Sequence, residues 1–173
     1  AGAGVCRWPQ RGVLGGGLAV RVWAAEAGFK RVAPLLDCYV RMVRGLGAGG
    51  SGQLAKMVNQ ICIAGLLQGL AEGLQFAKCA DLDLEAVVEV ISKGAAQSWQ
   101  MENRGATMHE DKFEFGFAVD WMRKDLGLCL AEANRNGALL PVSALVDQFY
   151  SEVQSIGAGR WDTSSLVRRL RRS

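Results

Sequence analysis

The sequence predicts a mainly α fold, in which an all-helical body at residues 50–173 follows a short strand–helix–strand segment. Three observations lead to this prediction. Apolar residues recur at helical spacing from residue 53 to residue 80, without an interrupting proline. Further stretches with the same period follow as far as the carboxyl end, separated by short turns. Short β-favouring stretches occur only before residue 46.

The amino-terminal part divides into four segments. Residues 1–17 have neither a helical nor a strand period and are rich in Gly and Arg, so we expect an irregular segment. Residues 18–23 favour a strand, 26–36 a short helix and 37–44 a second strand. A glycine-rich junction at residues 45–52 then leads into the helical body.

The body begins with one long helix at residues 53–80. It carries few charges (Lys56, Glu72 and Lys78), so we expect it to be buried on more than one side. Pro141 is expected just before a later helix, which Ser143 caps. The remaining helices are predicted at 84–92, 94–104, 118–136 and 142–156, followed by a last short helix with Asp162 or Thr163 as its N-cap.

Composition narrows the class of protein. Half of the 173 residues are hydrophobic and 21% are charged, which is the range of globular domains and argues against disorder.

The sequence shows no stretch of 18 or more uncharged apolar residues and no signal peptide. We therefore expect a cytoplasmic protein without a membrane partner. The amino-terminal arginines are not interleaved with aromatic residues, so nucleic acid is not an expected partner. His109 is the single histidine and the five cysteines are scattered, so no metal site is expected.

The junction contains the pattern Gly45-x-Gly47-x-x-Gly50 between a predicted strand and a predicted helix. In a βαβ unit such a pattern holds the pyrophosphate of a dinucleotide at a helix N-terminus. Here the following helix continues for nearly thirty residues, and no further strand is predicted after it. We therefore interpret these glycines as a joint between two layers of the structure.

Lys56 is the main candidate for chemistry. It lies near the start of the long helix, and Asn59 and Gln60 follow three and four residues later, on neighbouring faces. A lysine with an amide one turn away can hold a substrate oxygen and exchange a proton with it. The alternative is a lysine that extends its charge to solvent beside a capping amide. Spacing alone does not decide between these alternatives.

The segment from Gly50 to Gln60 resembles the G-x-G-x-x-x-K-x-x-N-x motif of the β-hydroxyacid dehydrogenases. The resemblance implies that Lys56 is the catalytic acid/base and that Asn59 helps to hold the substrate. Gln60 stands where many members have a second asparagine, which implies a substrate contact there as well. The long helix is similar to the family's interdomain helix, which joins the cofactor domain to an all-α domain. This similarity implies a homo-oligomer formed through residues 53–80.

A second segment, from Phe115 to Leu128, resembles the family's G-F-x-x-x-x-x-x-K-D-L-x-L stretch. The resemblance implies that Lys124 lies near the cofactor and that Phe117 lines the nicotinamide side. The alternative for Lys124 is an exposed ion pair with Asp120 at i, i+4 on an amphipathic helix.

Taken together, the resemblance implies an oxidoreductase that uses NAD or NADP. Hydride would pass between the nicotinamide and a small 3-hydroxy acid or its semialdehyde. Residues 18–49 would be a remnant of the Rossmann domain, and residues 50–173 the helical carboxyl-terminal domain. The family's first glycine-rich turn and its substrate loop do not occur, so a truncated or out-of-frame gene start and an inactive isolated chain are expected. The alternative function is a noncatalytic helical dimerisation module.

Overall fold

The computed structural model describes residues 18–22, 40–45 and 50–171. The chain forms two compact units, residues 1–59 and residues 60–173, and the boundary between them falls within one helix. The predicted irregular segment at 1–17 and the predicted helix at 26–36 lie outside the described residues.

The first unit contains two strands, β1 (Leu18–Val22) and β2 (Val40–Gly45), which pair in parallel. Both strands confirm sequence-based expectations in the part of the chain that is described. A parallel pair cannot be joined by a tight hairpin, so this pairing is the one that a strand–helix–strand segment requires. Among the described residues, every strand lies before residue 46, as the sequence predicts.

The long predicted helix is present as α3 (Ser51–Cys79). Gly50 precedes it with a φ of +97°, a backbone conformation that glycine adopts without steric cost. Leu67, Ala71 and Leu74 are buried on its inward face. The expectation that this helix is buried on more than one side is wrong within this chain, because Cys62, Gly69, Gly73 and Phe76 are all exposed on its other face.

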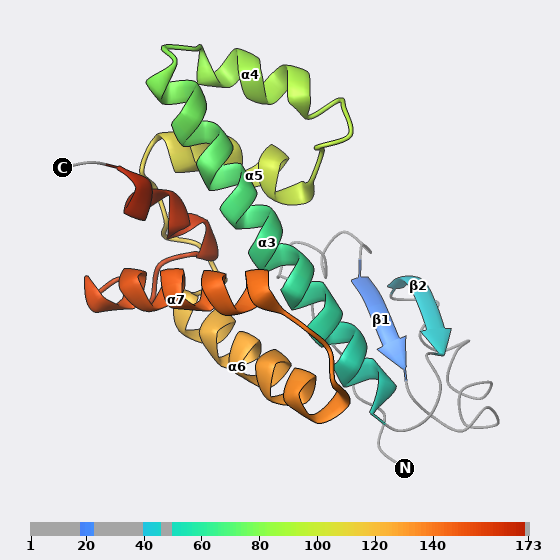
Figure 1. Cartoon of the computed structure of the whole chain (residues 1–173). Coiled ribbons are helices and arrows are strands. Elements are labelled where there is room, and N and C mark those ends of the chain that lie inside the picture. Colours follow the sequence, from blue (N-terminus) through green and yellow to red (C-terminus); the bar gives the residue numbers. More distant parts are fainter. Residues whose placement is uncertain (1–17, 23–39, 46–49, 172–173) are drawn as a thin grey trace. The chain divides into compact units, whose positions relative to one another are not determined.

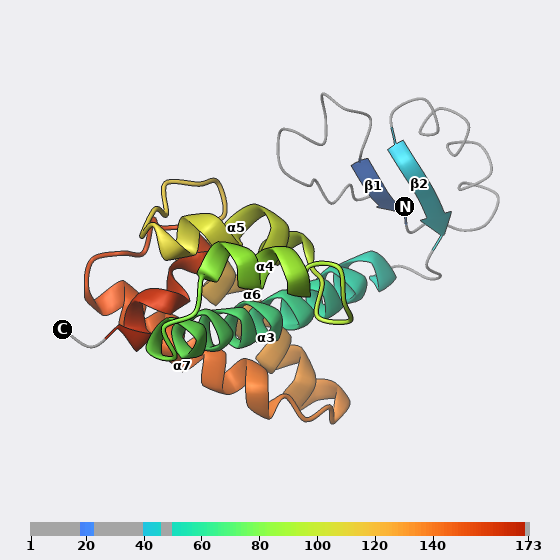
Figure 2. The same cartoon turned by 90° about the horizontal axis from the view of Figure 1, so that it is seen from above.

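The second unit continues with α4 (Leu84–Ile91), α5 (Trp99–His109), α6 (Val119–Asn136), α7 (Pro141–Ser155) and the 3-10 helix η1 (Thr163–Leu170). In Figures 1 and 2, α6 and α7 lie side by side and α4 lies beside α5. The buried core draws on the helices of this unit through Leu67, Met108, Met122, Leu126, Val146, Tyr150 and Leu166, among others. Burying a large apolar side chain contributes roughly 1.5–3 kcal/mol, so these contacts hold the helices together.

Side-chain caps explain where α4 and α5 begin. The Asp83 carboxylate accepts hydrogen bonds from two backbone N–H groups at the start of α4, and Ser98 does the same once for α5. The helix predicted at 94–104 therefore begins five residues later, after the Ser98 cap. Ser143 is not the cap of α7: it is buried inside the helix, and Pro141 occupies the first turn, where its missing N–H costs nothing.

Candidate functional site

Lys56 and Asn59 both lie in the amino-terminal turns of α3. Because α3 begins at Ser51, Lys56 belongs to the second turn of the helix rather than the first. Both side chains are partly buried, and both take part in interactions with their surroundings. The helix runs unbroken through both positions, so Lys56 and Asn59 lie one turn apart on one side of α3, as the sequence predicts. Their catalytic and substrate-binding roles stay predictions.

Gln60 is almost fully buried, with 4% of its surface exposed. Its Nε2 donates a hydrogen bond of 2.7 Å to Oδ2 of Asp125, which is itself buried. The bond connects α3 to α6 across 65 positions of sequence. The amide nitrogen of Gln60 is therefore engaged within the protein, and its predicted contact with substrate stays untested.

Sequence reasoning assigned no role to Asp125, although it stands within the K-D-L motif. One signal points to its burial: it lies at helical spacing with Met122 and Cys129, both of which are buried on α6. A carboxylate on an apolar face needs a hydrogen-bond donor, and Gln60 supplies one.

Phe117 lies just before the first residue of α6 and is partly buried. Its carbonyl oxygen accepts a hydrogen bond of 2.9 Å from the backbone N–H of Thr163. The neighbouring residue Ala118 forms an isolated antiparallel bridge with Asp162. The start of η1 thus fixes the backbone at Phe117 and the direction in which α6 begins.

Lys124 lies on the exposed side of α6. Its Nζ lies 5.7 Å from the ring centroid of Trp121, and half of the Trp121 side chain is exposed. The alternative ion pair with Asp120 is not formed, because Oδ1 of Asp120 instead accepts a hydrogen bond of 2.5 Å from Gln154. Lys124 therefore presents its charge outward beside an aromatic ring.

A chain of polar contacts holds α6 against α7. Arg123 forms a two-pronged ion pair with Asp147, at 3.1 and 3.2 Å, and donates a third hydrogen bond to Gln154. Gln154 in turn donates to Asp120. A Cβ added at Gly159 would collide with Oδ1 of Asp120, so only glycine fits there while this network stays in place.

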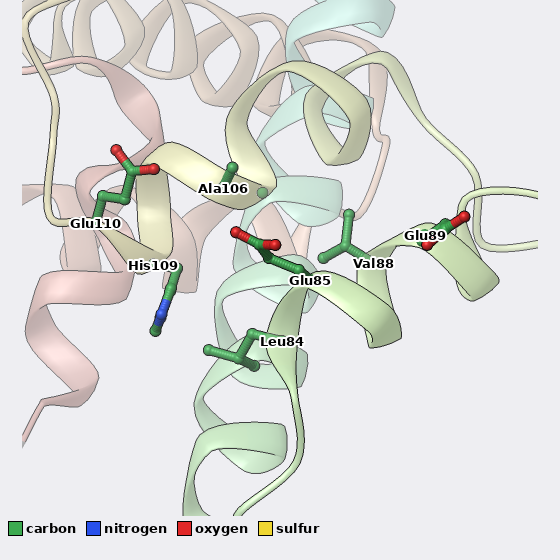
Figure 3. Close-up of a pocket in the computed structure, with 8 residues that line it drawn as sticks. Leu84, Glu85, Val88, Glu89, Ala106, His109 and Glu110 are labelled. Carbon is green, nitrogen blue, oxygen red and sulfur yellow. The ribbon is translucent and has the colours of Figure 1, made fainter.

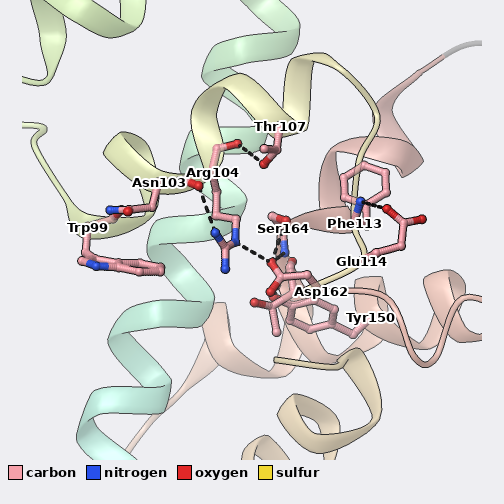
Figure 4. A network of polar contacts seen from close by, with 10 residues as sticks. Trp99, Asn103, Arg104, Thr107, Phe113, Glu114, Tyr150, Asp162 and Ser164 are labelled. Atoms are coloured by element: carbon pink, nitrogen blue, oxygen red, sulfur yellow. Dashed lines mark hydrogen bonds and ion pairs between the residues drawn. The ribbon is translucent and has the colours of Figure 1, made fainter. Parts of the chain in front are cut away.

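A second network surrounds the start of η1 (Figure 4). The buried Asp162 carboxylate accepts from the backbone N–H and the hydroxyl of Ser164 and pairs with Arg104 at 3.3 Å. Asp162 is the N-cap of η1, so of the two candidates that the sequence offered, Asp162 and Thr163, the first is confirmed. The Tyr150 hydroxyl donates to the carbonyl of Thr163, and burial, reinforced by the Asp162 charge, raises the pKa of Tyr150 well above its usual range. Tyr150 therefore acts as a neutral donor that holds η1 on α7.

A groove of about 240 Å³ lies between α4 and α5 (Figure 3). Leu84 and Val88 line it on the α4 side and Ala106 on the α5 side. The carboxylates beside them come from α4 and from Glu110, just after α5. His109, the single histidine, lines the groove, but none of the residues predicted to bind substrate or cofactor or to act in catalysis does. Among the described residues, no three His, Cys, Asp or Glu side chains are placed to share a metal ion.

The glycine junction ends in the described part of the chain at Gly50, followed by α3 with no intervening strand. The residues described after Gly50 contain no strand, so the βαβ unit that a dinucleotide fingerprint requires is not found there. Residues 46–49 of the junction lie outside the described residues, so the interpretation of the glycines as a joint stays a prediction.

Comparison with known proteins identifies the protein family. Residues 50–170 match the family described as the NAD-binding domain of NADP-dependent 3-hydroxyisobutyrate dehydrogenase. The chain is 62% identical over 164 residues to an uncharacterised oxidoreductase of Shewanella frigidimarina, covering 95% of this chain and 56% of that protein. It is 32% identical to 2-hydroxy-3-oxopropionate reductase of Escherichia coli, covering 92% of this chain and 54% of the reductase.

A solved structure agrees in fold. The 3-hydroxyisobutyrate dehydrogenase of Salmonella typhimurium superposes with a TM-score of 0.84 at 27% identity, over 96% of this chain and 59% of that one. The chain thus spans about half the length of the relatives that it matches, in their carboxyl-terminal part. On the match of residues 50–170, the chain belongs to the 3-hydroxyisobutyrate dehydrogenase family of β-hydroxyacid dehydrogenases.

Proposed function

We propose that this chain is the helical part of an NAD- or NADP-dependent dehydrogenase acting on a small 3-hydroxy acid or its semialdehyde. The family match over residues 50–170 carries the proposal. Two features of the structure support it. The matching lysine and amide share one side of an unbroken helix, and the second matching lysine presents its charge to solvent.

In this proposal Lys56 is the acid/base. Its ammonium group gives a proton to the substrate oxygen in reduction, and the neutral amine takes the hydroxyl proton in oxidation. Asn59, one turn further along α3, orients the substrate by hydrogen bonding. Gln60 lies on the following turn, where its Nε2 donates to Asp125, so a substrate contact at Gln60 would form beside that bond.

The residues described here fit a nicotinamide cofactor in part. Lys124 offers an outward cation suited to a phosphate or ribose oxygen. When bound, the cofactor supplies the hydride donor or acceptor. The discrimination between NAD and NADP would depend on residues upstream of α3, where the dinucleotide domain of a complete relative lies.

A cytoplasmic location and a homo-oligomer through residues 53–80 belong to the same proposal. The exposed apolar face of α3 supports the oligomer. That face also favours the second candidate function, a noncatalytic dimerisation module in which Lys56 and Lys124 have no chemical role.

Cofactor binding distinguishes the two functions. The test uses a fusion in which the Rossmann domain of a relative precedes residue 50, titrated with NADPH and with NADH by fluorescence. The dehydrogenase proposal expects saturable binding and turnover of 3-hydroxyisobutyrate or a similar hydroxy acid. A folded fusion that binds neither cofactor would support the dimerisation module instead.

A further inference from the structure

Asp120 and Lys124 have the spacing and the order that favour an ion pair, yet they do not form one. Asp120 lies in the first turn of α6 and Lys124 one turn later, on the same side of the helix. An acid that precedes a base by four positions is the more favourable order for such a pair. Within the described part of the chain, Lys124 has no ion-pair partner. A specific contact must therefore hold the Asp120 carboxylate elsewhere.

Gln154 of α7 provides that contact. Its Nε2 donates a hydrogen bond of 2.5 Å to Oδ1 of Asp120. Its Oε1 accepts one of 2.6 Å from Arg123, which is itself fixed by the two-pronged ion pair with Asp147. Because Arg123 can only donate, Gln154 turns its oxygen to Arg123 and its N–H group to Asp120. The Asp120 carboxylate is therefore bonded to α7 rather than to Lys124.

Gly159 leaves room for this arrangement. The backbone N–H of Asp120 donates to the carbonyl of Gly159 at 2.9 Å, so the first turn of α6 lies against the loop that follows α7. A Cβ at Gly159 would collide with Oδ1 of Asp120, the oxygen that Gln154 binds. Gly159 does not have a positive φ, so its backbone conformation does not require glycine. What the carboxylate needs from Gly159 is the missing side chain.

As a result, Lys124 is a cation with only a weak resting partner. Its Nζ lies 5.7 Å from the ring centroid of Trp121, and half of that side chain is exposed to water. A cation–π contact at an exposed site is weak. An ion pair with Asp120 would instead have to break before Lys124 could form charge-assisted hydrogen bonds to an incoming anion. Holding Asp120 on α7 removes that competition.

We propose that Gln154 and Gly159 are positioning residues for cofactor binding. By keeping Asp120 on α7, they leave the Lys124 ammonium group available to a phosphate oxygen of the nicotinamide cofactor. The inference rests on the cofactor role proposed for Lys124 and adds a determinant of the affinity. Neither Gln154 nor Gly159 touches the cofactor, and each acts through Asp120. The alternative is a network that only joins α6 to α7, in which the position of Asp120 does not matter to the cofactor.

The first test needs no cofactor. Gln154→Met keeps the length of the side chain, is tolerated in a helix and removes the donor to Asp120. A crystal structure of this variant of the 173-residue chain should show an Asp120 carboxylate oxygen within about 4 Å of Lys124 Nζ, the limit for an ion pair. Gly159→Ala should release Asp120 by a second route, because the added Cβ displaces Oδ1. An Asp120 carboxylate that stays apart from Lys124 in both variants would overturn the proposal.

The second test measures the dissociation constant of NADPH by fluorescence, in the fusion with a relative's Rossmann domain. Low ionic strength is used, because salt screens an exposed ion pair. Gln154→Met should raise the dissociation constant roughly two- to five-fold, the effect of competition from one exposed ion pair. Asp120→Asn removes the competing charge, so the double variant Gln154→Met/Asp120→Asn should bind NADPH as the parent does.

Gln148→Met is the matched control, because Gln148 is an exposed glutamine on the same helix. It should leave the dissociation constant of NADPH unchanged. The rescue by Asp120→Asn separates the proposal from damage to the packing of α6 on α7, because that substitution removes a charge and restores no contact between the helices.

The outcomes separate this inference from the proposed function. A loss of affinity in Gln154→Met that Asp120→Asn reverses supports the inference. An equal loss with and without Asp120→Asn shows that the network only joins the helices, and overturns it. Parent affinity in Gln154→Met, together with weakened binding in Lys124→Ala, overturns this inference alone and leaves the cofactor role of Lys124 in place. Parent affinity in both variants overturns the inference and the cofactor role together.

Discussion

Gln60 of α3 and Asp125 of α6 meet in a buried hydrogen bond of 2.7 Å between Nε2 and Oδ2. One of these residues belongs to the first family motif and the other to the second, so the bond joins the two motif segments of the chain directly. A buried carboxylate and a buried amide are costly unless each is paired, so this bond ties α3 to α6 at Gln60 and Asp125.

Asp125→Ala should destabilise the protein by about 1–3 kcal/mol, because it leaves the Gln60 amide buried without this acceptor. Urea unfolding of Gln60→Ala, Asp125→Ala and the double variant measures the coupling between the two side chains. Lys124→Ala, at the exposed neighbouring position, is the control and should change stability by less than about 0.5 kcal/mol. Additive effects of the two alanine substitutions would show that the bond contributes nothing to folding.

Lys56→Ala should lower kcat by a factor on the order of 10²–10⁴ in the fusion with a relative's Rossmann domain, the usual contribution of a positioned proton-transfer group. Thermal stability should change little. Lys78→Ala, in the last turn of the same helix, is the matched control and should retain the parent rate. An active fusion whose Lys56→Ala variant keeps its rate to within a few-fold would show that Lys56 is not the acid/base.

Asn59→Ala should mainly raise KM, provided that its contact is made equally in the ground state and the transition state. Initial-rate kinetics over a range of hydroxy acid concentrations in the same fusion separate the two parameters. A fall in kcat at constant KM would instead place the contact of Asn59 in the transition state alone.

Lys124→Ala should weaken NADPH binding by about 10-fold or more, the effect of losing one charge-assisted hydrogen bond. Fluorescence titration of the fusion measures the dissociation constant. Lys93→Ala, at an exposed position just after α4, controls for the loss of one positive charge. Equal dissociation constants for the parent and Lys124→Ala would remove Lys124 from the cofactor site.

Ser164 and Ser165 provide a matched pair for stability. Both are fully buried, but the Ser164 hydroxyl donates to Asp162 at 2.7 Å, whereas the Ser165 hydroxyl has no hydrogen-bond partner. Ser164→Ala should destabilise the protein by about 1 kcal/mol, and Ser165→Ala should be neutral or stabilising. Chemical denaturation measures both, and equal losses would contradict the difference in bonding.

The purified 173-residue chain should show no robust turnover of 3-hydroxyisobutyrate or glycerate with NAD or NADP, because its sequence contains no residue set suited to cradle a pyrophosphate. Absorbance of NADH or NADPH measures the rate. Sustained turnover by this polypeptide would show that the cofactor contacts described for complete relatives are not required.

The sequence by itself determined the features that depend on near neighbours. Helical periodicity and the absence of proline predicted α3. The cap of the last helix was narrowed to Asp162 or Thr163, because a helix N-terminus needs an acceptor within a few residues. The two motifs were sufficient to identify the family, because their residue types and order are read directly from the chain. Lys56 and Asn59 could be placed on one side of α3 for the same local reason.

Only the tertiary structure decided which distant groups meet. The packing of the helices decides that Gln60 meets Asp125 and that Asp120 meets Gln154 rather than Lys124. It also decides which face of α3 is exposed. Helix hydrogen bonds join residues four apart, so periodicity reports on the helix itself and on its apolar face. A buried polar group needs a hydrogen-bond partner, and that partner can lie tens of residues away in the sequence. Spacing along the chain does not show which distant groups are brought together, because their contact depends on how the side chains pack.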